Sequence, residues 1–206
     1  MNASQALLMS GTRALPVDLT ALAEFFGIKV VSYEDVAAIY SKTKEELYRD
    51  SRFGFCFCEE GRLVCAINEN ACGERRRRWT LAHEIGHCLL GHLGAEKPSR
   101  EQEKEADRFA AELLAPLVVL HFCGVGSAKE LAALCGISAQ AAGIRFGELC
   151  REQKLSAERS RSFRLGQSTK PPAGFIRMKE ELSLFAAFEP FVGEYICEKR
   201  ARRACG

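Results

Sequence analysis

Residues 75–92 read RRRRWTLAHEIGHCLLGH, and this stretch decides how the rest of the chain is interpreted. His83 and His87 are four residues apart. On a helix this spacing is about 40° of rotation and about 6 Å of rise, so both imidazoles can reach one ion. Glu84, set back from the ion, could take a proton from a metal-bound water and pass it to a leaving amine. The pattern His-Glu-x-x-His is typical of zinc hydrolases, so we expect His83 and His87 as ligands and Glu84 as general base.

A third ligand is needed, because catalytic zinc usually takes three protein groups and keeps one position for water or substrate. In one known layout it is a histidine six residues past the second, but that position is Leu93. A carboxylate from the next predicted helix, REQEKEADRFAAELLAP, is then the expected ligand. Glu105 is the first choice, since it lies one turn before Phe109 in the apolar stripe. Glu103 is the second choice, and Glu101 shares the face of Glu105 but lies farther out.

The sequence also indicates which other side chains are unsuited as metal ligands and which metals the site could bind. Cys88 and His92 would be rotated well away from the histidine pair on a continuous helix, so we expect neither as a ligand. One Zn²⁺ per chain is expected from the pattern, although two histidines and a carboxylate also suit iron or manganese.

Hydrophobic periodicity and turn residues predict a mixed α+β domain over residues 1–155. A helix begins near Pro16, a strand is expected over 28–33, and a second helix over 34–49. FGFCFCEEGRLVCAIN reads as a hairpin, so a small antiparallel sheet should precede the histidine helix. These elements suit a zincin-like domain, in which the metal ligands lie on a helix beside a sheet.

The remaining segments are helical or polar. A helical pair over 127–154 resembles a helix-turn-helix. Residues 156–172 are polar and end in Pro-Pro, which predicts a linker over 156–174. Residues 175–206 should form a separate helical tail of unknown role, with an apolar face interrupted at Pro190.

Composition bounds the setting of the protein. The 206 residues are 47% hydrophobic and carry a net charge of only +2, as expected of an ordinary globular protein. The first fifteen residues lack an export signal, and no run approaches the roughly 18 apolar residues of a membrane span. We therefore expect a cytoplasmic protein without a membrane partner, whose ten cysteines are mostly free thiols. The oligomeric state is not predicted.

Two features raise nucleic-acid binding as an alternative. Arg75–Arg78 is a basic run, but phosphate contacts normally need a larger basic footprint. The second helix of the helix-turn-helix-like pair offers only Gln140 and Arg145 for base or phosphate contacts. Direct nucleic-acid binding is therefore not expected. A non-catalytic module that binds a repressor or DNA, with zinc structural or absent, is the alternative to an enzyme.

Three segments together resemble the ImmA/IrrE family of metallopeptidases: RRRRWTLAHEIGHCLLGH, EKEADRFAAELLAP and LAALCGISAQAAGIRFGEL. The resemblance covers roughly residues 16–150. It implies His83, His87 and Glu105, the glutamate before Ala-Asp, as zinc ligands, and Glu84 as general base. It also implies a site-specific protease that cleaves or inactivates a helix-turn-helix repressor and so induces genes of a phage, a mobile element or a stress response.

Two details of substrate handling stay open. An oxyanion donor is required, and Tyr40, Tyr48, His92 and His121 are candidates that the sequence does not rank. The strand RLVCAIN, just before the histidine helix, could pair with an extended substrate segment.

Overall fold

The computed structural model divides the chain into two compact units. Unit 1 is Met1–Thr12 with Pro16–Leu114, and unit 2 is Arg13–Leu15 with Ala115–Gly206. The break therefore comes earlier than the predicted domain end at residue 155. The structure describes residues 1–41, 43, 45–47, 51–71, 73–94, 97–164 and 175–204.

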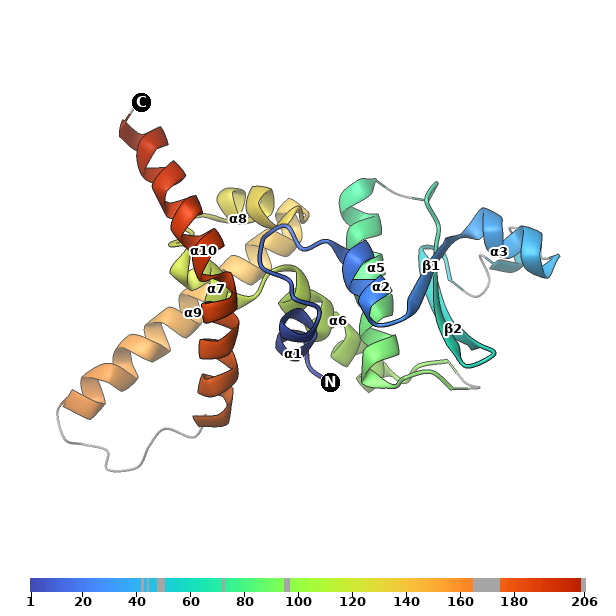
Figure 1. Cartoon of the computed structure of the whole chain (residues 1–206), viewed down its shortest axis with the longest axis horizontal. Helices are drawn as coiled ribbons and strands as arrows, with labels where there is room; N and C mark the ends of the chain where they lie inside the picture. The colour runs from blue at the N-terminus through green and yellow to red at the C-terminus, as the bar shows by residue number, and fades with distance from the viewer. Residues whose placement is uncertain are drawn as a thin grey trace. The chain divides into compact units, whose positions relative to one another are not determined.

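Unit 1 is the mixed α+β part of the chain. Its elements, drawn in Figure 1, are α1 (Ala3–Met9), α2 (Leu19–Phe25), β1 (Ile28–Ser32), α3 (Tyr33–Tyr40), β2 (Gly54–Glu59), β3 (Arg62–Ile67), α5 (Glu74–Leu90) and α6 (Arg100–Leu114). Short polar side chains begin several helices. Asp18 accepts hydrogen bonds from two backbone N–H groups of α2, and Ser32 forms a capping box with Asp35 at α3.

The sheet has the order β1-β3-β2 and is mixed. The predicted hairpin is confirmed, because β2 pairs antiparallel with β3. Glu60 and Gly61, between the strands, have φ of 48° and 77°, as a two-residue type I′ turn requires. The prediction of an antiparallel sheet was incomplete, because β1 adds to β3 in parallel. The chain leaves β1 through α3, and this crossover lets β3 run in the same direction as β1.

Helices cover both faces of this sheet (Figure 1). On one face Tyr33 and Val36 of α3 pack with Leu47 and Ala66, and Phe55 and Phe57 of β2 line the same cluster. On the other face α5 lies against β2 and β3, and the Sγ atoms of Cys65 and Cys88 are 3.7 Å apart. Alternating residues of the strands therefore pack into two different hydrophobic cores, one on each face of the sheet.

Helices α5 and α6 approach closely at Gly86. A Cβ at this position would lie 3.2 Å from Cδ1 of Phe109 and 3.4 Å from the backbone oxygen of Ala106. The buried face of α6 includes Phe109 of the predicted apolar stripe and consists of Ala106, Phe109, Ala110, Leu113 and Leu114. The missing side chain of Gly86 thus lets the acidic helix α6 lie directly beside the His83–His87 segment.

Unit 2 consists of helices: α7 (Leu117–Phe122), α8 (Ala128–Cys135), α9 (Ala139–Arg164) and α10 (Phe175–Ala204). The predicted helical pair over 127–154 is present as α8 and α9. The predicted linker is partly helical, because α9 continues to Arg164, and residues 165–174 lie outside the described part. Alanine, glutamate and arginine, which occur after residue 155, are good helix formers and favour this longer helix.

The C-terminal helix packs within unit 2 and is not a separate tail. The rings of Phe122 in α7 and Phe185 in α10 have centroids 3.9 Å apart. Glu130 of α8 accepts a hydrogen bond from the hydroxyl of Tyr195 and forms an ion pair with Lys199. Pro190 lies inside α10 without ending it, at the loss of one backbone hydrogen bond.

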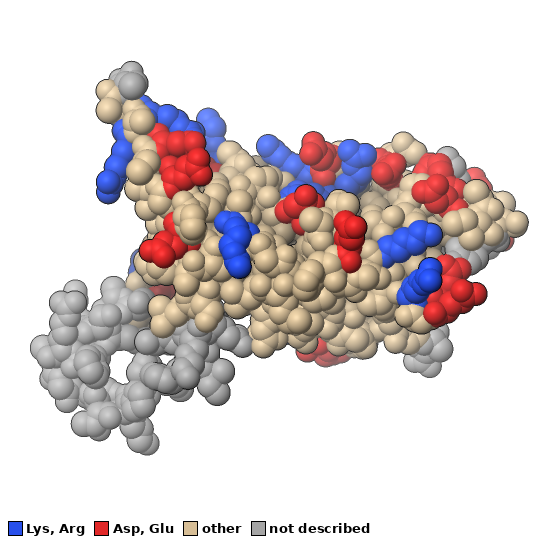
Figure 2. Space-filling view, in the orientation of Figure 1, with Lys and Arg blue, Asp and Glu red and all other residues tan. Residues whose placement is uncertain are grey.

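The surface of the described chain carries both charge signs. Figure 2 shows acidic and basic side chains interspersed over the visible face, with lysine and arginine gathered at the C-terminal end of α10. None of the helices in the described ranges is both long and apolar enough for a membrane span. The eight described cysteines are all free.

Candidate metal centre

Helix α5 carries the histidine pair into the interior of unit 1. The segment from Glu84 to Cys88 is buried, since the sheet lies on one side of the helix and α6 on the other. The side chains of His83 and His87 are 15% and 3% exposed. The surrounding side chains therefore restrict the orientation of both imidazole rings.

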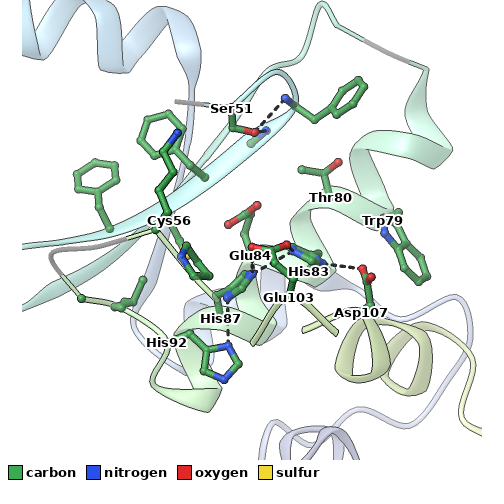
Figure 3. Close-up of a pocket in the computed structure, with 18 of the residues that line it drawn as sticks. Ser51, Cys56, Trp79, Thr80, His83, Glu84, His87, His92, Glu103 and Asp107 are labelled. Atoms are coloured by element: carbon green, nitrogen blue, oxygen red, sulfur yellow. Dashed lines mark hydrogen bonds and ion pairs between the residues drawn. The ribbon is translucent and has the colours of Figure 1, made fainter. Parts of the chain in front are cut away.

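Three donor atoms converge at one point, as Figure 3 shows. Nε2 of His83 and Nε2 of His87 are 3.0 Å apart. Oxygens of Glu103 lie 3.3 Å from Nε2 of His83 and 3.5 Å from Nε2 of His87. Tetrahedral donors about 2.0–2.1 Å from a zinc ion lie about 3.3 Å from one another. The separations of His83, His87 and Glu103 therefore fit a single ion of this size.

Asp107 fixes the orientation of the first histidine. Nδ1 of His83 lies 3.0 Å from Oδ1 of Asp107. An ionised carboxylate can only accept, so we assign the ring hydrogen to Nδ1, which leaves Nε2 of His83 with a free lone pair. This lone pair and the Glu103 carboxylate are both acceptors, and no hydrogen lies between them. A cation bound between them would interact favourably with both.

The carboxylates of α6 are not arranged as the sequence analysis expected. Glu103 lies with the histidine pair, whereas Oε2 of Glu105 is 3.2 Å from Nε2 of His92. Glu101 is exposed and does not belong to the converging group. Measured around the helix from buried Ala106, Glu103 is about 60° away and Glu105 about 100° away on the other side. The choice of Glu105 rested on its spacing from Phe109, but His83 and His87 face the side of α6 that carries Glu103 and Asp107.

His92 lies beside the histidine pair, although the sequence analysis expected it to be rotated well away from that pair. Its Nδ1 lies 3.1 Å from Nδ1 of His87. The expectation that His92 points away assumed a continuous helix, but α5 ends at Leu90 and Gly91 takes a left-handed conformation with φ of 77°. Gly91 was the signal available in the sequence, because glycine in this conformation commonly ends a helix.

The environment of Glu84 favours proton transfer. Burial raises the pKa of Glu84 to about 7, while nearby His83 and a hydrogen bond with Cys56 act in the opposite direction. Burial, together with His83 and His92, lowers the pKa of His87 to about 4. His87 is therefore neutral at pH 7, as a metal ligand must be, and Glu84 can exist in both protonation states near that pH.

An open pocket of about 910 Å³ lies in front of these residues. Strand β2 and helix α5 supply most of its lining, including Cys56, Arg76, Trp79 and Thr80. Strand β3, the predicted partner for an extended substrate, is the central strand and is paired with β1 and β2. Within the described chain β2 pairs with β3 alone, so β2 presents the edge that borders the pocket.

The candidate oxyanion donors are not gathered at the pocket. His92 lines it but contacts His87 and Glu105. His121 belongs to unit 2, where its Nδ1 is 3.3 Å from Nε2 of Gln153. Tyr48 and the side chain of Tyr40 lie outside the described part of the chain.

Most arginines proposed for nucleic-acid contact are engaged inside their own units. Arg76 lies over the ring of Phe53 at 4.6 Å, Arg77 donates to the carbonyl of Glu69, and Arg78 donates to the carbonyl of Val17. In unit 2, Arg145 is buried and donates to Ala115 and Glu148. Arg145 therefore stabilises the packing of its unit.

A comparison with protein families matches residues 23–146, more than half of the chain, to Peptidase_M78, described as the IrrE N-terminal-like domain. This match includes the histidine helix, α6 and the start of α9. It confirms the resemblance to the ImmA/IrrE family. Comparison with curated proteins finds no match.

Proposed function

Because the chain belongs to the Peptidase_M78 family of IrrE N-terminal-like domains, which suggests a metallopeptidase-like function, we propose that it is a zinc-dependent endopeptidase. In this proposal His83, His87 and Glu103 hold one ion per chain. The observation that carries it is the convergence of three donor atoms, 3.0 to 3.5 Å apart, at the pocket. Glu103 replaces Glu105 as the proposed third ligand for that reason.

The residues present suit peptide hydrolysis. A zinc ion held there would supply Lewis acidity, polarising a peptide carbonyl and lowering the pKa of water toward about 7. Glu84, buried beside the donors, would accept a proton from the attacking water and return it to the departing nitrogen. Burial raises the pKa of Glu84 in the metal-free protein to about 7, and a bound cation would lower it and so favour the ionised form that accepts the proton.

Strand β2 would hold the substrate. An extended peptide could add to its open edge by backbone hydrogen bonds, which bind without regard to side-chain identity. Side-chain preference would then come from pocket residues such as Arg76 and Trp79. The proposed substrate is a helix-turn-helix repressor, and its unfolded or linker segments would supply the extended conformation. The proposed setting is the cytoplasm, where thiols stay reduced.

Metal content tests the site first. Protein purified without added metal should contain about one zinc per chain by mass spectrometry, and the same measurement identifies iron or manganese if either is bound. His83→Ala and Glu103→Ala should lose the metal, whereas Glu105→Ala should keep the stoichiometry. Absence of metal from wild type after zinc is offered would refute the proposal.

Proteolysis tests the activity. Wild type and Glu84→Gln are incubated with a candidate helix-turn-helix repressor, and the products are identified by mass spectrometry. Cleavage by the wild type that Glu84→Gln abolishes supports an endopeptidase. If Glu84→Gln still relieves repression in cells, the protein acts as a non-catalytic binding module instead.

A further inference from the structure

We propose that His92 and Glu105 form a hydrogen-bonded relay that holds His87 in the tautomer and orientation needed to bind the metal. His92 is thus a positioning residue, and Glu105 acts through it. The inference rests on the metal site proposed above. It also gives a role to the acidic residue that sequence reasoning placed on the metal itself.

The end of α5 brings His92 into place. Gly91, with φ of 77°, reverses the chain direction, and the backbone N–H of His92 then donates to the carbonyl oxygen of His87 at 3.0 Å. The same turn sets the His92 ring against the His87 ring, with centroids 5.2 Å apart. The contact is therefore built into the helix terminus and does not depend on a flexible loop.

The order of the hydrogen bonds follows from what each group can donate. The ionised carboxylate of Glu105 only accepts, so Nε2 of His92, at 3.2 Å, carries a hydrogen. A neutral His92 then has a bare Nδ1, which accepts a hydrogen bond from Nδ1–H of His87 at 3.1 Å. This leaves the lone pair of His87 on Nε2, the atom that faces His83 and Glu103.

Both histidine ligands are then anchored to carboxylates of α6. His83 donates directly to Asp107, and His87 reaches Glu105 through His92. The side chains of His87 and His92 are only 3% and 7% exposed, so water cannot readily replace the contact between them. Glu105 is 49% exposed, so water can replace part of its contribution. We therefore expect a larger effect from changing His92 than from changing Glu105.

Zinc affinity, measured by competition with a chromophoric chelator, tests the relay. His92→Phe keeps a ring but removes both hydrogen bonds, and it should weaken zinc binding about 10- to 100-fold, the usual effect of losing such a partner. His92→Asn should recover most of the affinity, because its side-chain oxygen can accept where Nδ1 did. Glu105→Gln should weaken binding less than tenfold. His121→Phe, a histidine change in unit 2, is the matched control and should have no effect.

A second readout reports the tautomer directly. Long-range ¹H–¹⁵N NMR of the metal-free protein should show His87 protonated at Nδ1 in wild type and in His92→Asn, but a mixture of tautomers in His92→Phe. Circular dichroism of each variant checks that it is folded.

The outcomes separate the two proposals. If wild type binds no zinc, the proposed function fails. If wild type binds zinc and His92→Phe binds it equally well, or if His92→Asn is as weak as His92→Phe, the relay is overturned alone. If Glu105→Gln loses zinc as completely as Glu103→Gln, Glu105 is a ligand and the relay is also overturned.

Discussion

Replacing Glu84 by glutamine should stabilise the metal-free protein at neutral and alkaline pH while abolishing proteolysis. Glu84 is 7% exposed, and burial raises its pKa from the ordinary 4.5 to about 7. Between pH 4.5 and pH 7, Glu84 is therefore protonated in the folded state but ionised in the unfolded state. The free energy of unfolding of the wild type falls as pH rises from about 4.5 to about 7. At about 1.4 kcal/mol per pH unit, the total loss is about 3 kcal/mol.

Glutamine cannot ionise, so this loss should be absent from the variant. Urea unfolding with a chelator present should show similar free energies of unfolding for wild type and Glu84→Gln at pH 4. At pH 8 the variant should be more stable by up to about 3 kcal/mol. Glu69→Gln, at an exposed position just before α5, is the control for removing a surface carboxylate. A difference between wild type and Glu84→Gln that is the same at both pH values would refute the argument that burial of this carboxyl destabilises the charged form.

Two further predictions concern packing. Gly86→Ala should lower the free energy of unfolding by about 1 kcal/mol or more, because the new methyl group would press on Phe109. Gly143→Ala, on an open face of α9, should raise the free energy of unfolding by up to about 1 kcal/mol, because alanine favours a helix more than glycine does. Urea unfolding measures both changes. Glu130→Gln should increase hydrogen exchange in α10 about tenfold, because charge-assisted hydrogen bonds contribute about 1.5–3 kcal/mol. Exposed Glu198→Gln should leave that exchange nearly unchanged, and equal effects of the two substitutions would contradict the role given to Glu130.

Much of the fold followed from local patterns. The β2–β3 hairpin was visible in two apolar runs around Glu-Glu-Gly, and the buried face of α6 followed from helical spacing. Other features depended on contacts between distant segments. Nothing near β1 in the sequence says that it joins β3 in parallel, and the packing of α10 on α7 depends on residues more than fifty positions apart.

The sequence by itself determined the pair His83 and His87 with Glu84 between them, because a spacing of four on one helix fixes relative positions without reference to any other element. Only the tertiary structure decided which carboxylate of α6 joins them. Glu103 and Glu105 lie on opposite sides of the helix, and the packing of α6 beside α5 brings Glu103 to the histidine pair and Glu105 to His92. The helix end at Gly91 decided the place of His92 in the same way. A turn that reverses the chain changes which side chains contact one another. The periodicity of a continuous helix does not predict these contacts.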